Sequence, residues 1–288
     1  MIFVSDKQNI CDKAPLPVRR IAAVHDLSCF GRCALTVIAP TLSAMGYQVI
    51  PIPTCLLSTH TGGFTGYAFH DLTSEHPAIL KHWDTLGIKF DFIYSGYLGS
   101  AEQIRTVEQI KNRFLAENGK FIVDPVMGDS GKLYAGFTED FVDKMRSLCK
   151  QADFILPNAT EACYLTGTSY PATDPERLVT ELKSVCPRPI VTGILENKKN
   201  SVYYADENGK IEAYRSENIE GFFCGAGDVF ASAFVGALAR GKKEETAIAL
   251  ATEFTTASIR RSAKEVADKR YGLNFEAEIF TFLKNLNS

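Results

Sequence analysis

The chain has 288 residues, a formal net charge of −3 and a sequence pI near 6.0, with 45% hydrophobic and 23% charged residues. These values are typical of a globular protein, and the length suits one large α/β domain or two small ones. No basic block is interleaved with aromatic residues, so nothing indicates a nucleic acid or an anionic membrane as a partner.

The first residues carry a short apolar patch that is followed by an acid and a lysine, which is neither a signal peptide nor a membrane anchor. We expect residues 1–18 to form an N-terminal extension and residues 19–288 to form a single domain. Eight cysteines occur without a CxxC pair or zinc-ligand spacing, a usage typical of reduced thiols. The expected location is therefore the cytoplasm.

Short apolar runs alternate with stretches of helical periodicity, which predicts a mostly parallel sheet covered by helices on both faces, an α/β fold. The predicted strands are Ile21–Val24, Gln48–Ile52, Phe90–Tyr94, Lys120–Val123, Phe154–Leu156 and Pro189–Val191. The predicted helices lie near residues 33–45, 75–87, 101–117, 138–150, 158–166 and 174–184.

The pattern changes after Val191. Val202–Ala205 and Lys210–Tyr214 flank a turn of Asp-Glu-Asn-Gly, which predicts a hairpin that closes one edge of the sheet. From Ala226 to about Arg261 the periodicity indicates nearly continuous helix, broken at residues 240–242.

Polar residues follow five of the predicted strands. They are His25-Asp26, Ser95-Gly96-Tyr97, Asp124-Pro125, Pro157-Asn158 and Thr192-Gly193. Because ligands bind at the carboxyl ends of the strands in open parallel sheets, this grouping predicts a binding site along one rim.

The segment Cys224-Gly225-Ala226-Gly227-Asp228 precedes an apolar helix. Two glycines there allow free N–H groups to point outward, and with the positive helix end they form an anion site. The alternative is a simple turn in which Asp228 caps the helix.

Asp228 favours the functional interpretation. A carboxylate beside a phosphate site would repel the phosphate unless it held a proton donor against it. An unperturbed aspartate, with a pKa of about 3.9, is ionised at neutral pH, and the helix end should keep it so. In phosphoryl transfer the nucleophile needs orientation more than full deprotonation.

Gly225-Ala226-Gly227-Asp228 resembles the GxGD signature of the ribokinase-like superfamily. Further segments resemble its vitamin B6 kinase branch and run in the family's order over roughly residues 21 to 262. They are residues 57–62 (LSTHTG), 95–100 (SGYLGS), 124–129 (DPVMGD) and 158–161 (NATE). The resemblance implies a three-layer α/β/α sandwich with a central, mostly parallel sheet. It also implies an ATP-dependent kinase that phosphorylates the 5′-hydroxymethyl group of pyridoxal, pyridoxamine or pyridoxine.

The resemblance also implies roles for residues around the nucleotide. Asp228 would be the catalytic base, and Gly225, Ala226 and Gly227 would form the anion hole. The residues implied in ATP binding are Asp124, Tyr134, Asn158, Glu161 and Thr192. Asp124 and Glu161 would hold Mg²⁺, directly or through water. For Asn158 and Glu161 a capping box, N-x-x-E, is the alternative, and both roles are compatible. No Walker loop is present.

The resemblance places Asp26, Thr61, Gly62 and Tyr97 around the acceptor, with His60 nearby and Asp228 against the reacting hydroxyl. An aromatic ring could stack on Tyr97 and pair with Asp26. For His60, a hydrogen-bonded structural role is the alternative. We expect the glycine-containing stretch Leu56–His70 to act as a flap over the substrate.

Two departures concern the substrate. Many pyridoxal kinases have serine where this chain has Asp26, and Leu57 replaces a commoner phenylalanine. Asp26 is closer to the hydroxymethylpyrimidine kinases of thiamine synthesis, although their following glycine cluster is absent. A sugar kinase fits worse, because no early Gly-Gly with a sugar-reading segment is present.

Two alternatives therefore stay open beside the B6 kinase: a hydroxymethylpyrimidine kinase, and a non-catalytic vitamer- or nucleotide-binding protein. The presence of Asp228, Asp124 and Glu161 argues against the second. The resemblance suggests a homodimer and leaves open whether a monovalent cation such as K⁺ takes part.

Overall fold

The computed structural model describes residues 18–288, so the expected extension at residues 1–18 lies, apart from Val18, outside the described residues. The main sheet has six strands in the order β3-β2-β1-β4-β5-β8. Every neighbouring pair in it is parallel except β2 and β3. The strands are β1 (Arg20–Phe30), β2 (Gln48–Thr59), β3 (Phe69–Asp71), β4 (Phe90–Ser95), β5 (Leu115–Val123) and β8 (Phe154–Ile155).

A second, antiparallel sheet follows in the order β11-β10-β9. Its strands are β9 (Ile190–Glu196), β10 (Lys199–Ala205) and β11 (Ile211–Glu217). Single parallel bridges, Ile155 to Pro189 and Asn158 to Thr192, join β9 to the end of the main sheet. The predicted hairpin is therefore present, but it pairs with β9 in a sheet of its own. A short hairpin of β6 (Gly128–Asp129) and β7 (Lys132–Leu133) follows β5.

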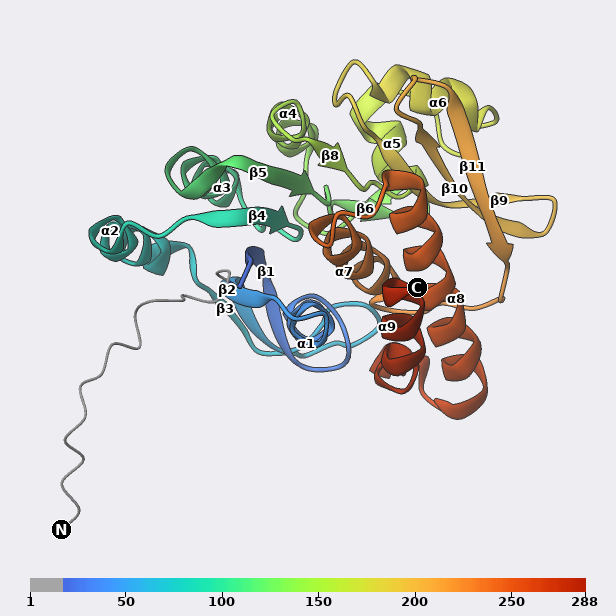
Figure 1. Ribbon diagram of the computed structural model, residues 1–288, viewed down its shortest axis with the longest axis horizontal. Coiled ribbons are helices and arrows are strands. Elements are labelled where there is room, and N and C mark those ends of the chain that lie inside the picture. The colour runs from blue at the N-terminus through green and yellow to red at the C-terminus, as the bar shows by residue number, and fades with distance from the viewer. Residues whose placement is uncertain (1–17) are drawn as a thin grey trace, which may run out of the picture.

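Helices cover both faces of the main sheet (Figure 1). One face carries α2 (His76–Leu86), α3 (Ala101–Phe114), α4 (Glu139–Cys149), α5 (Ala159–Thr166) and α6 (Pro175–Leu182). The other face carries α1 (Leu35–Ala44), α7 (Ala226–Ala239), α8 (Glu244–Glu265) and α9 (Ile279–Asn287). Three short 3₁₀ turns, Thr73–Glu75, Lys269–Tyr271 and Glu276–Glu278, complete the elements. The expected three-layer α/β/α arrangement is confirmed.

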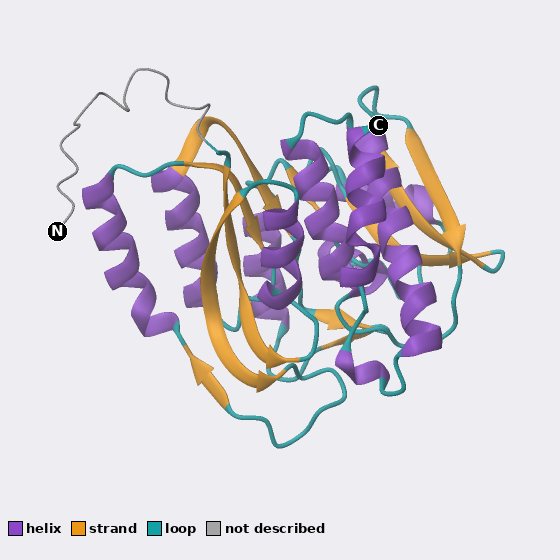
Figure 2. Cartoon of the chain, turned by 60° about the horizontal axis from the view of Figure 1, so that its bottom comes forward, coloured by secondary structure: helices purple, strands orange, loops and turns teal. Residues whose placement is uncertain are grey.

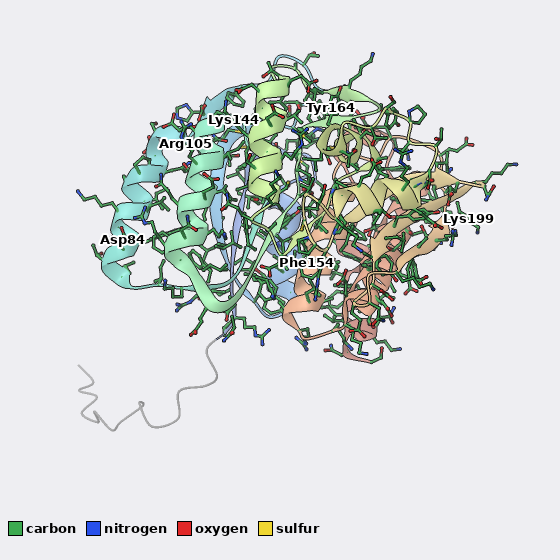
Figure 3. The ribbon with its side chains drawn as sticks, turned by 90° about the horizontal axis from the view of Figure 1, so that it is seen from above. Asp84, Arg105, Lys144, Phe154, Tyr164 and Lys199 are labelled. Atoms are coloured by element: carbon green, nitrogen blue, oxygen red, sulfur yellow. The ribbon has the colours of Figure 1, made fainter. Side chains whose placement is uncertain are left out.

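The strands are buried on both faces, which explains their continuous apolar runs. In β1, Ile21 and Ala23 pack towards α7, whereas Ala22 and Val24 pack towards α3 and α4. Alternate side chains of a strand point to opposite faces, so a strand between two helical layers must be apolar throughout. Figure 3 shows the outer layer of α2, α3 and α4, which carries Asp84, Arg105 and Lys144.

The first two strands run further than their apolar runs predict. β1 and β2 stay paired to Phe30 and Thr59, with a register shift between His25 and Leu27. Figure 2 shows these long curved strands reaching a loop at the lower edge of the molecule. His25 and Asp26 therefore lie inside a strand and not after it. The helix α9 is also absent from the sequence-based prediction.

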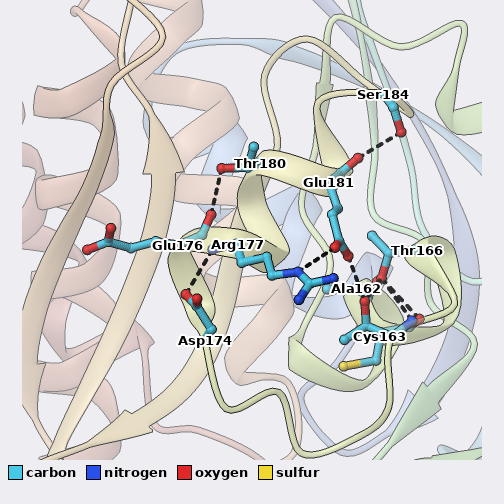
Figure 4. Close-up of polar contacts among 10 residues, drawn as sticks. Ala162, Cys163, Thr166, Asp174, Glu176, Arg177, Thr180, Glu181 and Ser184 are labelled. Atoms are coloured by element: carbon cyan, nitrogen blue, oxygen red, sulfur yellow. Dashed lines mark hydrogen bonds and ion pairs between the residues drawn. The ribbon is translucent and has the colours of Figure 1, made fainter.

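Side-chain caps fix the ends of the outer helices. In α6, Asp174 accepts from the Arg177 amide at 3.0 Å, and Arg177 pairs with Glu181 at 2.8 Å (Figure 4). Thr168, after α5, donates to the same glutamate at 2.8 Å and so ties the two helices together. Over residues 18–288, every helix is too short or too polar to cross a lipid bilayer.

Candidate active site

The glycine-rich segment forms the start of α7. Gly225 is the N-cap residue, in the left-handed region at φ 79°. A Cβ atom on Gly225 would lie 2.1 Å from the carbonyl oxygen of Arg32, so only glycine fits both the conformation and the space. Asp228 stands three residues later, in the first helical turn. The alternative that Asp228 itself caps the helix is wrong.

One carboxylate oxygen of Asp228 is held by a distant segment. The amide of Ala34 donates to its Oδ2 at 2.8 Å. Ala34 has φ 47° and ψ −130°, a region that residues with a Cβ rarely adopt. The strained backbone before α1 thus points an N–H at the proposed base. The sequence carries no local signal for this contact, because 194 positions separate the two residues.

The protonation of Asp228 differs from the expectation. Burial raises its pKa to about 7, and the nearby Asp26 and Cys224 act in the same direction. The Ala34 amide and the helix end oppose this rise without cancelling it. Desolvation penalises the charged form more than the helix end favours it. Asp228 is consequently a stronger proton acceptor than an ordinary aspartate.

Asn158 and Glu161 form the capping box of α5. The Asn158 Oδ1 accepts from the Glu161 amide at 3.0 Å, and Glu161 Oε2 accepts from the Asn158 amide at 2.9 Å. The other oxygen, Oε1, accepts from the Met127 amide at 3.1 Å, and Asn158 Nδ2 donates to the Gly128 carbonyl at 2.8 Å. These contacts fasten the loop after Asp124 to the start of α5. The capping-box interpretation is confirmed.

Asp124 stands between these two helix ends. Its amide donates to the Ser95 carbonyl at 2.8 Å, and its side chain is buried. Burial, and then the charges of Glu161 and Asp228, raise the pKa of Asp124. No salt bridge among residues 18–288 includes it. The fold therefore gathers three carboxylates without a cationic partner at one rim.

Tyr134 and Thr192 flank this rim. The Tyr134 amide donates to the Met127 carbonyl at 2.9 Å, and the side chain is 43% exposed. Thr192 lies within β9, where its amide donates to the Pro157 carbonyl at 3.0 Å. Thr192 is joined to Asn158 of the capping box by a parallel bridge.

Asp26 lies within β1, and Tyr97 lies two residues after the end of the neighbouring strand β4. Asp26 occupies the register shift of β1, where a bulge re-aims side chains, and it accepts from the Ser28 hydroxyl at 2.9 Å. Burial raises its pKa. Tyr97 is half-buried next to Phe137, with 5.9 Å between ring centroids, and its carbonyl accepts from Thr54 at 3.1 Å.

Both ring nitrogens of His60 make hydrogen bonds to the backbone. Nε2 is 2.6 Å from the Arg270 carbonyl and therefore donates to it, while Nδ1 accepts from the Gly62 amide at 3.1 Å. The ring also lies against Gly31, where a Cβ would approach it to 2.5 Å. Thr61, in contrast, is exposed. The geometry favours the structural alternative for His60.

Cys224 is a neighbour of His60 that the sequence interpretation did not single out. Its sulfur lies 3.5 Å from His60 Nδ1. A hydrogen bond with Cys33 and the His60 ring lower the pKa of the Cys224 thiol, against the effect of burial. The only sequence signal is its place directly before Gly225.

The loop between β2 and β3 is fixed at both ends. Its first end is held by His60, and its last end pairs antiparallel with β2 through Phe69–Asp71. Asp71 accepts from the Thr73 amide at 2.7 Å, and Gln103 of α3 donates to the Thr73 hydroxyl at 2.8 Å. The expected flap at Leu56–His70 is thus partly strand, and residues 60–67 lie between the paired segments, because Ala68 still hydrogen-bonds with Ser58.

Comparison with known proteins identifies relatives of this arrangement. The family model described as phosphomethylpyrimidine kinase matches residues 39–272. A Bacteroides thetaiotaomicron protein, provisionally named phosphomethylpyrimidine kinase and solved with pyridoxal, is 38% identical at a TM-score of 0.86, over 94% of this chain and 96% of that one. Pyridoxal kinase from Lactobacillus plantarum is 31% identical at a TM-score of 0.87, over 92% and 97% of the two chains. The pyridoxal kinase of Vibrio parahaemolyticus is 26% identical over 242 residues, 77% of this chain and 80% of the relative.

Proposed function

Because this chain belongs to the phosphomethylpyrimidine kinase family, we propose that it is an ATP-dependent pyridoxal kinase, which phosphorylates the 5′-hydroxymethyl group of pyridoxal, pyridoxamine or pyridoxine. The observation that carries the proposal is the placement of Asp228 in the first turn of α7, at the positive end of that helix and near Asp124. The similarity to a protein solved with pyridoxal supports the choice of acceptor.

In the proposed reaction, the oxygen of the substrate hydroxyl bonds to the γ-phosphorus of ATP and ADP leaves. Asp228 accepts the proton of that hydroxyl. A pKa near 7 suits this role, because a general base works best when its pKa is close to the operating pH. The backbone amides at Gly225, Ala226 and Gly227 stabilise the charge on the phosphoryl group in transfer. The amide of Ala34 keeps the base in place.

Asp124 and Glu161 are the residues proposed for Mg²⁺. The donor set fits, since Mg²⁺ prefers carboxylate oxygens and shares its remaining positions with water and phosphates. Asp124 lacks a cationic partner, whereas both oxygens of Glu161 already accept from backbone amides. Glu161 is therefore proposed to act through water. The ion, when bound, neutralises phosphate charge.

The remaining site residues are proposed to shape the two substrate pockets. Tyr134, Asn158 and Thr192 would line the nucleotide side, with Asn158 acting through the loop that it fastens. Asp26, Thr61, Gly62 and Tyr97 would line the vitamer side. His60 would contribute by fixing the first end of the flap.

Further proposals concern the whole protein. We propose one catalytic domain over residues 19–288, a homodimer in solution and a cytoplasmic location. The described cysteines, all unpaired, support a reducing compartment. Light scattering tests the dimer, and activity in KCl against tetramethylammonium chloride tests K⁺ dependence.

A panel of acceptors tests the function. ATP consumption is measured with pyridoxal, pyridoxamine, pyridoxine and hydroxymethylpyrimidine at equal concentrations, with Asp228→Asn as the control. We expect the B6 vitamers to be turned over fastest. A preference for hydroxymethylpyrimidine would favour the second candidate, which Asp26 and the name of the matching family support. Equal background with every acceptor would contradict both enzymes.

A further inference from the structure

Three neighbouring strands carry a row of polar side chains beneath the proposed base. His25 on β1, Tyr94 on β4 and Asp124 after β5 lie on the sheet face that α7 covers. Tyr94 pairs with Ala23 and with Ile122, so His25 and Asp124 lie two residues further along the neighbouring chains, on the same face and diagonal to Tyr94. All three side chains are buried, at 1%, 0% and 8% exposure. Such a row is unexpected in an otherwise apolar layer.

Tyr94 borders the Asp124 carboxylate. Its hydroxyl is buried and has no partner in ordinary hydrogen-bond geometry. A tyrosine hydroxyl can donate one hydrogen bond. It is thus a donor next to a carboxylate that has no cationic partner.

His25 fixes the Tyr94 ring from the other side. The two rings meet edge to face, with 4.3 Å between centroids. Gly96 makes room for the imidazole, since a Cβ there would lie 2.2 Å from its atoms. Burial lowers the pKa of His25 to about 3, so the ring is neutral. Its Nε2, like the tyrosine hydroxyl, is buried without a partner.

Leaving a buried hydroxyl unpaired destabilises the fold, and phenylalanine at position 94 would avoid that cost. A buried donor beside a metal-binding carboxylate has a known physical use. Partners of this kind orient the ligand, and their loss typically weakens metal binding about 10–100-fold.

We propose that Tyr94 is a positioning residue for Asp124, with His25 holding the tyrosine ring in register, so that this row orients the carboxylate towards the magnesium of a bound Mg-nucleotide. The inference rests on the proposed function, in which Asp124 binds that ion. It adds two residues that do not touch either substrate.

Binding without turnover tests this role. Calorimetry measures the Kd of ADP with Mg²⁺ and with EDTA, for the wild-type protein and for Tyr94→Phe. We expect a Kd for MgADP about tenfold higher in the variant and a Kd for metal-free ADP within about twofold. The KM for pyridoxal should also stay within about twofold, whereas the KM for MgATP rises.

The matched control is Tyr47→Phe. Tyr47 belongs to the same core layer and donates to the Gly236 carbonyl at 2.8 Å, in the last turns of α7. The Tyr47→Phe substitution removes a buried tyrosine hydroxyl that lies away from the site, so the Kd for MgADP should be unchanged. His25→Leu should weaken MgADP binding in the same selective way as Tyr94→Phe, by a smaller factor. Circular dichroism and Tm establish that each variant is folded.

The outcomes separate this inference from the proposed function. An unchanged MgADP Kd in Tyr94→Phe, or an equal loss with EDTA or in Tyr47→Phe, would overturn the positioning role. If the wild-type protein failed to phosphorylate any B6 vitamer while Tyr94→Phe lost MgADP selectively, the activity would be wrong and the positioning role would stand.

Discussion

Asp228 and Glu161 occupy the same position in two different helices, yet their surroundings differ. Each is the third residue after the N-cap, in α7 and α5 respectively. In α5 the N-cap is Asn158, and the glutamate turns back to satisfy the amides of its own helix start. In α7 the N-cap is Gly225, which has no side chain to reciprocate. Asp228 therefore turns outward to Ala34 and keeps its other oxygen available. The N-cap residue therefore determines whether the carboxylate three positions later is used to cap its own helix or keeps an oxygen free for chemistry.

The largest effect is expected from Asp228→Asn. The amide keeps the shape but loses the proton acceptor, so kcat should fall a hundredfold or more while the affinities for nucleotide and vitamer stay within a few-fold. Steady-state kinetics and calorimetry measure the two quantities. Near-normal turnover would remove the base assignment.

Gly225→Ala tests the N-cap of α7, which has no side chain. Gly225 has a left-handed backbone, and the added methyl group would lie 2.1 Å from the Arg32 carbonyl oxygen. The turn before α7 must therefore shift, and with it the first helical turn that carries Asp228. We expect kcat to fall about tenfold or more and the free energy of unfolding to fall by about 1–3 kcal/mol. Gly241→Ala is the matched control, because Gly241, after the other end of α7, is also left-handed at φ 83° but a Cβ there meets no neighbour within 4 Å. Equal behaviour of the two variants would contradict the argument.

Glu161→Ala tests the capping box of α5. The loss of an acceptor for the Asn158 and Met127 amides should lower the free energy of unfolding by about 1–3 kcal/mol. It should also raise the Mg²⁺ concentration needed for half-maximal activity. Denaturant titration and a magnesium titration follow the two effects separately. A stability loss with an unchanged magnesium requirement would leave Glu161 with the capping role alone.

The smallest effect concerns pH. Because burial raises the pKa of Asp228 to about 7, the base is protonated below that pH, and kcat/KM should rise as pH increases through about 7. Asp26 contributes to that elevated pKa through its charge. Asp26→Asn should therefore move the midpoint to lower pH, whatever its effect on KM. A profile flat from pH 5 to 8 in the wild-type protein would argue against Asp228 as the titrating group.

The sequence predicts most of the buried framework, because strands covered on both faces must be apolar and helices against them must be periodic. It underestimates β1 and β2, since polar residues such as Asp26 and Ser28 interrupt the apolar pattern where backbone pairing with the neighbouring strand continues. The residues of the candidate site that follow a glycine signature or a strand end are recognisable. Ala34 is not, because its role depends on its backbone angles and on a partner 194 positions away. The sequence leaves the role of His60 open for the same reason, because its hydrogen-bond partner, the Arg270 carbonyl, is brought to it only by the fold.

The two fixed ends of the β2–β3 loop limit how the active site can open. His60 secures one end to the main chain near the C-terminus, and the strand pair at Phe69–Asp71 secures the other. Between them, Phe64 meets the His60 ring at 5.0 Å between centroids and lies under the Arg270 guanidinium, so the middle of the loop must break these contacts before it can move. Asp228 is held by a different segment, through the Ala34 amide, so its orientation does not depend on the contacts that close this loop.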